Sequence, residues 1–125
     1  MMRRKVLLVD DDPAFTRLVK LNLEATGRYE VCEDNNPATA LMMAHAFHPD
    51  VILLDIVMPE IDGGDLRAMF REDPALRNTP TVFLTALVDK HEVDRHQGHF
   101  ADGDFLAKPV SPDELMDCIE AHLPS

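Results

Sequence analysis

The sequence lacks any apolar stretch long enough to cross a membrane, which takes roughly 20 residues. After the basic residues 3–5 in the sequence, the first apolar run covers only residues 6–9 before three aspartates interrupt it. That run is too short for the hydrophobic region of a secretory signal peptide. We therefore expect a cytoplasmic protein that does not associate with a membrane.

Basic residues and cysteines are also scarce. Twelve Lys and Arg residues face 23 Asp and Glu residues, so the net charge is -11. This charge argues against nucleic acid as a direct partner, because general electrostatics would repel it. Two cysteines without a pattern, Cys32 and Cys118, are typical of reduced thiols rather than of a disulfide. The 125 residues contain no repeat or linker and predict a single domain, 1–125.

Short apolar runs alternate with amphipathic helical stretches along the chain. Strands are predicted at residues 5–9, 29–33, 51–55, 81–85 and 105–107. Helices are predicted to begin at Pro13 behind the capping residue Asp12, at residues 36–37, at residues 63–64 and at residues 111–112. A further helix is expected within residues 88–103, short or irregular, because few apolar residues there have helical spacing. The alternation predicts an α/β fold, with a parallel sheet and helices on both of its faces.

Polar residues stand where the predicted strands end. Asp10 and Asp11 follow the first strand, Asp55 ends the third, Thr85 ends the fourth and Lys108 follows the fifth. In an open parallel sheet, ligands bind at the carboxyl ends of the strands. Grouped carboxylates repel one another unless a cation such as Mg²⁺ joins them, and Mg²⁺ prefers oxygen ligands and phosphate. With a hydroxyl and an ammonium nearby, one carboxylate could serve as the nucleophile of phosphoryl transfer.

Four blocks of sequence carry a family resemblance. They are residues 9–13 (VDDDP), residues 53–59 (LLDIVMP) with the pair at 62–63, residues 84–86 (LTA), and residues 105–109 (FLAKP). In this order and spacing they resemble the receiver domains of response regulators, over residues 5–123. The resemblance implies a flavodoxin-like, doubly wound five-stranded parallel sheet with strand order 2-1-3-4-5 and about five helices. It also implies a function in two-component signal transduction.

The resemblance assigns a magnesium-dependent phosphorylation site. Asp55 would accept a phosphoryl group from a phosphohistidine of a sensor kinase or a histidine phosphotransfer protein. Asp10, Asp11, Asp55 and the backbone carbonyl of Val57 would hold Mg²⁺. The protein would then be a switch that binds a downstream protein target, as a monomer or a phosphorylation-dependent dimer, and not an enzyme acting on other substrates.

The resemblance also implies roles around the phosphoryl group. Thr85, Ala86 and Lys108 would bind it, and Phe105 would be the aromatic residue that changes position on activation. Val57 and Leu87 are apolar at positions that flank the phosphoryl group. We hypothesise that they hinder the attacking water and prolong the life of the phosphorylated state, which a half-life of seconds would contradict.

Two other functions are compatible with parts of the pattern. A magnesium-dependent phosphatase similar to the haloacid dehalogenase superfamily would use Asp10 as nucleophile and Asp12 as acid and base. A phosphorylation-independent binding module would share the fold and lack the chemistry. His91, His96 and His99 have no spacing typical of zinc ligands, so a solvated loop is expected there.

Overall fold

The computed structural model describes residues 3–56, 58, 61, 63–85, 99, 100, 103–107 and 111–123. Among these residues, five parallel strands make up most of a six-stranded sheet, in the order β2-β1-β3-β4-β6. They are β1 (Arg4–Val9), β2 (Tyr29–Asp34), β3 (Val51–Asp55), β4 (Thr81–Thr85) and β6 (Gly103–Ala107). The predicted parallel sheet and its strand order are confirmed.

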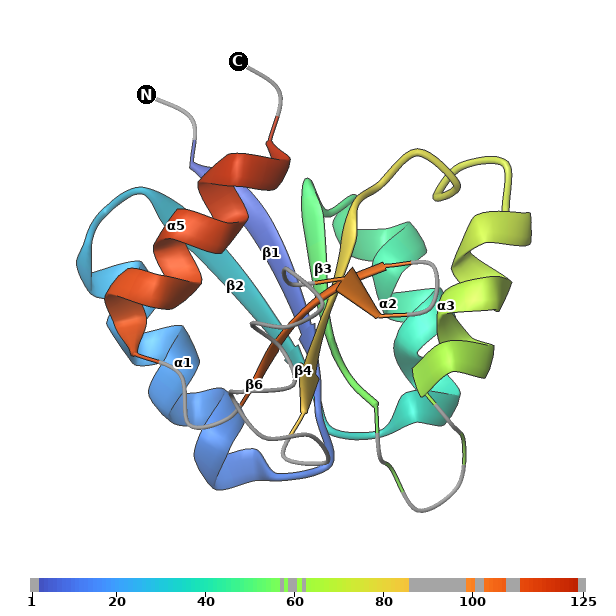
Figure 1. The fold of residues 1–125 in the computed structure, drawn as a ribbon, viewed down its shortest axis with the longest axis horizontal. Coiled ribbons are helices and arrows are strands. Elements are labelled where there is room, and N and C mark those ends of the chain that lie inside the picture. The colour runs from blue at the N-terminus through green and yellow to red at the C-terminus, as the bar shows by residue number, and fades with distance from the viewer. Residues whose placement is uncertain are drawn as a thin grey trace.

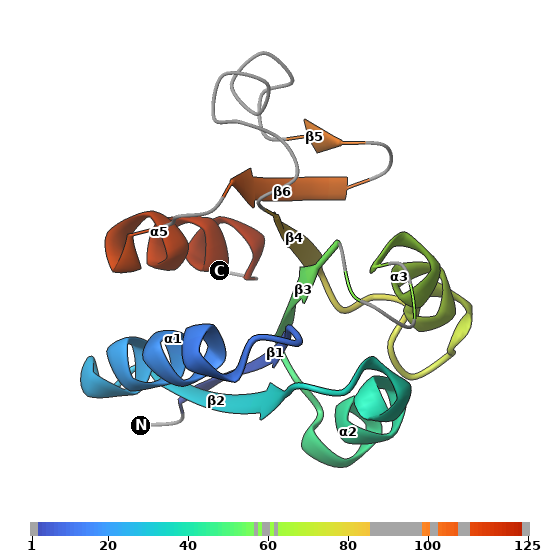
Figure 2. The ribbon, with the colours of Figure 1, turned by 90° about the horizontal axis from the view of Figure 1, so that it is seen from below.

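A short sixth strand was not predicted. Strand β5 (His99–Phe100) pairs antiparallel with β6 and forms the edge of the sheet (Figure 2). It lies inside the stretch where a further helix was expected. Residues 86–98, which make up most of that stretch, lie outside the described residues.

Two pairs of helices cover opposite faces of the sheet (Figure 1). Helices α1 (Pro13–Ala25) and α5 (Pro112–His122) lie on one face, and α2 (Ala40–Phe47) and α3 (Gly63–Glu72) lie on the other. Strand β1 supplies both faces, because successive side chains of a strand point to opposite sides. Val6 and Leu8 pack in the cluster with α1 and α5, while Leu7 and Val9 pack in the cluster with α2 and α3.

Helix α1 begins behind the capping residue that the sequence predicted, and α5 begins at its predicted position. The Asp12 carboxylate accepts hydrogen bonds from the backbone of Ala14 at 3.0 Å and of Phe15 at 3.3 Å, and Pro13 is the first residue of α1. Ser111 forms a reciprocal capping box with Glu114 at the start of α5. Before α2 the chain makes one 3₁₀ turn, η1 (Pro37–Thr39), a refinement of the predicted helix start.

Gly63 allows α3 to begin directly against the end of β3. Its N–H donates a 2.8 Å hydrogen bond to the Ile56 carbonyl. A Cβ added at this position would lie 2.7 Å from the Ile56 Cα, which real side chains do not tolerate. The glycine therefore determines how closely α3 approaches the strand that ends at Asp55.

The described structure bears on two expectations about the chain, one on its cysteines and one on membrane-spanning segments. In the described structure Cys32 and Cys118 form no disulfide, and each is half-buried. Among the described parts of the chain, no helix combines the length and the hydropathy that a bilayer crossing requires.

Candidate functional site

The register of the parallel strands brings the predicted site residues to one edge of the sheet. Val9 pairs with Leu54, so Asp10 and Asp55 are each one residue further along neighbouring strands. In the same register Asp55 pairs with Leu84, which places the backbone of Thr85 one residue beyond it. The ladder continues to β6, where Ala107 pairs with Thr85. The carboxyl ends of four strands thus meet at one edge, where ligands bind in this architecture.

Three carboxylates converge at this edge. Asp10, Asp11 and Asp55 each offer an oxygen atom, and these atoms all lie within 4.8 Å of one another. Asp10 is 1% exposed and Asp55 is 6% exposed, whereas Asp11 faces solvent. A set made only of carboxylate oxygens, open to water on one side, suits a hard divalent cation such as Mg²⁺. The grouping predicted from the strand ends is confirmed for these three residues.

Asp12 has a different place from its two neighbours. Its carboxylate is engaged by the backbone N–H groups at the start of α1, and it is exposed and not part of the acidic cluster. The alternative hypothesis of a phosphatase requires the Asp12 carboxylate to act as a general acid and base beside Asp10. A helix cap does not provide that function, so the geometry argues against the phosphatase.

A hydrogen-bonded network behind the cluster was missed at the sequence level. The Asn35 side-chain nitrogen lies 2.8 Å from the Asp10 carbonyl and 2.9 Å from the Thr16 hydroxyl. Thr16 is fully buried and its hydroxyl is 2.9 Å from a Glu33 carboxylate oxygen. The available signal was a polar residue, Thr16, on the side of α1 that also carries Val19 and Leu23, which pack in the core.

Several predicted site residues are not described in full. Val57, Ala86, Leu87 and Lys108 lie outside the described residues. For Thr85 and Phe105 the backbone is described, in β4 and β6. Their assigned roles stay predictions. His91 and His96 also lie outside the described residues, and His99 is described only as part of β5.

Comparison with known proteins points to one family. Residues 6–120 match the family model described as the response regulator receiver domain. The chain is 40% identical over 116 residues to the response regulator PleD of Caulobacter vibrioides, and 30% identical over 122 residues to the polar-differentiation response regulator DivK of Brucella ovis. The matches cover 92% and 98% of this chain. They span 24% of PleD and 98% of DivK.

Solved structures give the same result. The chemotaxis protein CheY4 of Vibrio cholerae superposes with a TM-score of 0.82 at 29% identity, covering 98% of this chain and 100% of the other. The receiver domain of a signal transduction histidine kinase from Syntrophus aciditrophicus superposes with a TM-score of 0.78 at 32% identity, covering 96% and 89%. Sequence and fold therefore agree on the family.

Proposed function

Because the chain belongs to the response regulator receiver family and is a receiver of two-component signal transduction, we propose that Asp55 is its phosphate-accepting residue. The observation that carries this proposal is the convergence of Asp10, Asp11 and Asp55 at the carboxyl edge of the sheet. Of the three, Asp55 ends the central strand β3, between β1 and β4. The proposal covers residues 1–125 as a single domain acting in the cytoplasm.

The proposed reaction is phosphoryl transfer from a histidine to a carboxylate. An Asp55 carboxylate oxygen forms a bond to phosphorus, the bond from phosphorus to the histidine nitrogen breaks, and that nitrogen keeps the electron pair. The product is an aspartyl phosphate. Magnesium, when bound, would neutralise charge on the phosphoryl oxygens and on the carboxylates. Members of this family generally bind Mg²⁺, and here Asp10, Asp11 and Asp55 would hold it.

The remaining assignments complete the proposed site. The Val57 carbonyl would be a further metal ligand, and Thr85, Ala86 and Lys108 would bind the phosphoryl group. The strand register supports Thr85, because its backbone stands beside Ala107, which Lys108 follows in the sequence. Phe105 would be the residue that changes position on phosphorylation.

The lifetime of the phosphorylated state is a separate part of the proposal. Val57 and Leu87 are apolar residues beside the expected phosphoryl group, and they would hinder the water that attacks it. Replacing Leu87 with a polar residue should therefore shorten the half-life of phosphorylated protein, measured by intact mass after removal of the phosphate donor. An unchanged half-life would contradict this role.

A histidine kinase or histidine phosphotransfer protein would dock on α1. This helix begins at Pro13, two residues after Asp11 in the sequence. It carries two exposed leucines, Leu18 at 58% and Leu21 at 59% exposure. Their spacing of three residues places them on one side of the helix. For the transfer to occur, a partner that covers this side must bring its histidine to Asp55.

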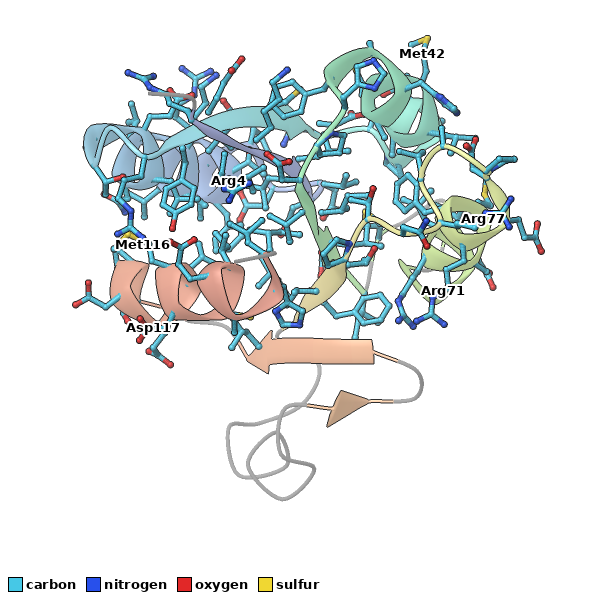
Figure 3. The ribbon with its side chains drawn as sticks, turned by 90° about the horizontal axis from the view of Figure 1, so that it is seen from above. Arg4, Met42, Arg71, Arg77, Met116 and Asp117 are labelled. Carbon is cyan, nitrogen blue, oxygen red and sulfur yellow. The ribbon has the colours of Figure 1, made fainter. Side chains whose placement is uncertain are left out.

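Comparing a histidine-containing donor protein with acetyl phosphate distinguishes an effect on docking from an effect on the phosphorylation reaction itself. Leu18→Ser should slow phosphorylation by a histidine-containing donor protein and leave phosphorylation by acetyl phosphate unchanged. Met42→Ser is a matched control, because Met42 is 64% exposed on α2, on the opposite side of the sheet (Figure 3). Equal rates for wild type and both variants with the protein donor would contradict docking on α1.

Mass spectrometry after acetyl phosphate treatment tests the acceptor. Wild type should gain one phosphoryl group in the presence of Mg²⁺ and not with EDTA, and Asp55→Asn should gain none. An adduct that persists in Asp55→Asn and disappears in Asp10→Ala would support the phosphatase instead. A wild type that binds neither Mg²⁺ nor beryllofluoride would be a phosphorylation-independent binding module.

A further inference from the structure

The polar network behind the acidic cluster connects Asp10 to α1 and β2. We propose that Asn35 is a positioning residue for the metal-binding carboxylates, holding the peptide group between Asp10 and Asp11 so that both carboxylates face Asp55. The inference rests on the proposed function, because it assumes that these carboxylates bind Mg²⁺. Asn35 belongs to none of the four sequence blocks that indicate the family.

The hydrogen bonds of the network have a defined direction. The Asp10 carbonyl can only accept, so the Asn35 amide must present its nitrogen, with one hydrogen for Asp10 at 2.8 Å and one for Thr16 at 2.9 Å. Thr16 then has its own hydrogen available for Glu33 at 2.9 Å, or for the Pro13 carbonyl at 3.2 Å. Each donor of the Asn35 amide therefore has a partner.

The far end of the network is held by a charge. The Glu33 carboxylate, whose side chain is 12% exposed, also receives the Arg17 side chain at 3.1 Å from the solvent side. Hydrogen bonds to an ionised acceptor are stronger than those between neutral groups. Glu33 thus orients the Thr16 hydroxyl, and the hydroxyl oxygen is left to accept from Asn35.

The position of Asp10 explains why such a support matters. Strand β1 ends at Val9, so Asp10 is the first residue beyond the strand. Its N–H is bonded to the Asp34 carbonyl at 3.1 Å, and Asn35 bonds its carbonyl. Together these bonds fix the peptide groups on both sides of Asp10. The second of these peptide groups leads into Asp11, so its orientation determines where the Asp11 carboxylate points.

Mutual repulsion of the carboxylates works against this arrangement. Three negative oxygens lie within 4.8 Å of one another before any cation binds. Without Asn35 the peptide between Asp10 and Asp11 could rotate and let the carboxylates separate. Binding Mg²⁺ would then require the site to be reassembled, and partners behind the ligands of a metal commonly change its affinity by about 10- to 100-fold.

The test compares two adjacent asparagines in the full chain. Asn35→Ala removes the support of Asp10, whereas Asn36→Ala removes a bond of similar kind, the 3.0 Å cap of Ala38 in η1, with no bond to the cluster. A Mg²⁺ titration followed by amide NMR shifts gives the dissociation constant. Circular dichroism gives the melting temperature without Mg²⁺, which shows that each variant is folded at the temperature of the titration.

We expect Asn35→Ala to raise the Mg²⁺ dissociation constant about ten-fold or more, and Asn36→Ala to change it less than two-fold. Thr16→Ser, which keeps the hydroxyl, should bind Mg²⁺ like wild type, whereas Thr16→Val should bind more weakly. A general loss of stability would affect the two asparagine variants alike. If folded Asn35→Ala has a Mg²⁺ dissociation constant within two-fold of wild type, the inference about Asn35 is overturned and the proposed function is not. Absence of Mg²⁺ binding by wild type would instead overturn the proposed function.

Discussion

Removing one charge from the acidic cluster should stabilise the protein in the absence of metal. Asp11→Asn is the suitable change, because Asp11 is the exposed member of the cluster. At a separation of 4.8 Å, two unit charges repel by about 1 kcal/mol in water and about 3.5 kcal/mol at an effective dielectric constant of 20. The variant loses two such repulsions, with Asp10 and with Asp55.

The expected gain is near the lower end of that range. Water screens the exposed Asp11, so we expect the free energy of unfolding to rise by about 1–2 kcal/mol in EDTA. Urea unfolding followed by far-UV circular dichroism measures this difference. Asp117→Asn on α5 is the control, because it removes the same charge from an exposed position on a helix that contributes no carboxylate to the cluster (Figure 3). It should change stability by less than about 0.5 kcal/mol.

Magnesium should reduce or reverse the order of stability. At a Mg²⁺ concentration 100 times the wild-type dissociation constant, binding stabilises wild type by about 2.7 kcal/mol. A variant that binds ten times more weakly gains about 1.4 kcal/mol under the same conditions. The advantage of Asp11→Asn should therefore shrink by more than about 1 kcal/mol. Equal stability in EDTA, together with an equal gain from Mg²⁺, would refute this reasoning.

Three further changes test the architecture around the site. Gly63→Ala should lower the free energy of unfolding by about 1–3 kcal/mol in urea denaturation, because its Cβ would collide with the end of β3. Asp12→Ala should cost about 1 kcal/mol by loss of the α1 cap in the same assay. Burial raises the pKa of the Asp73 carboxyl, but the hydrogen bonds from the Ala75 backbone and from His45 outweigh it and lower that pKa below 3.8. A carboxyl whose pKa is lower in the folded protein stabilises the fold at pH values above its pKa in the unfolded chain, so Asp73→Asn should lower stability at neutral pH. The difference from wild type should disappear as the pH falls through the lowered pKa. Thermal unfolding at a series of pH values measures it.

Each of these changes has its own control or contrary outcome. Gly64→Ala, at the exposed neighbouring position of α3, should not destabilise. Asp12→Ala should keep its phosphorylation by acetyl phosphate, and loss of that reaction in a folded variant would revive an acid and base role for Asp12. A difference between wild type and Asp73→Asn that persists unchanged well below pH 3.8 would show that the charge on Asp73 is not what stabilises.

Local signals in the sequence predicted most of the framework. Runs such as residues 51–55 could be recognised as buried strands, Asp12 as a helix cap and residues 111–112 as a helix start, because these features depend on a few neighbouring residues. The grouping of Asp10 and Asp55 was also predictable. Parallel strands place their carboxyl ends at one edge, whatever their separation in the sequence.

Features that depend on distant partners were missed. Strand β5 exists through its pairing with β6, and its two residues carry no pattern of their own. Asn35 and Thr16 are ordinary polar residues in the sequence. Their role depends on β2 lying beside β1, which brings Asn35 to the carbonyl of Asp10.

The sequence by itself determined the order of the elements and the set of carboxylates at the strand ends, because hydrophobic periodicity and caps act locally. Tertiary structure decided the different environments of the adjacent aspartates, with Asp10 buried and Asp11 exposed. It also decided the supports behind them. The physical reason is that burial and long-range hydrogen bonds arise where elements distant in the sequence pack together in space. The residues on either side of a position in the sequence do not reveal which elements these are.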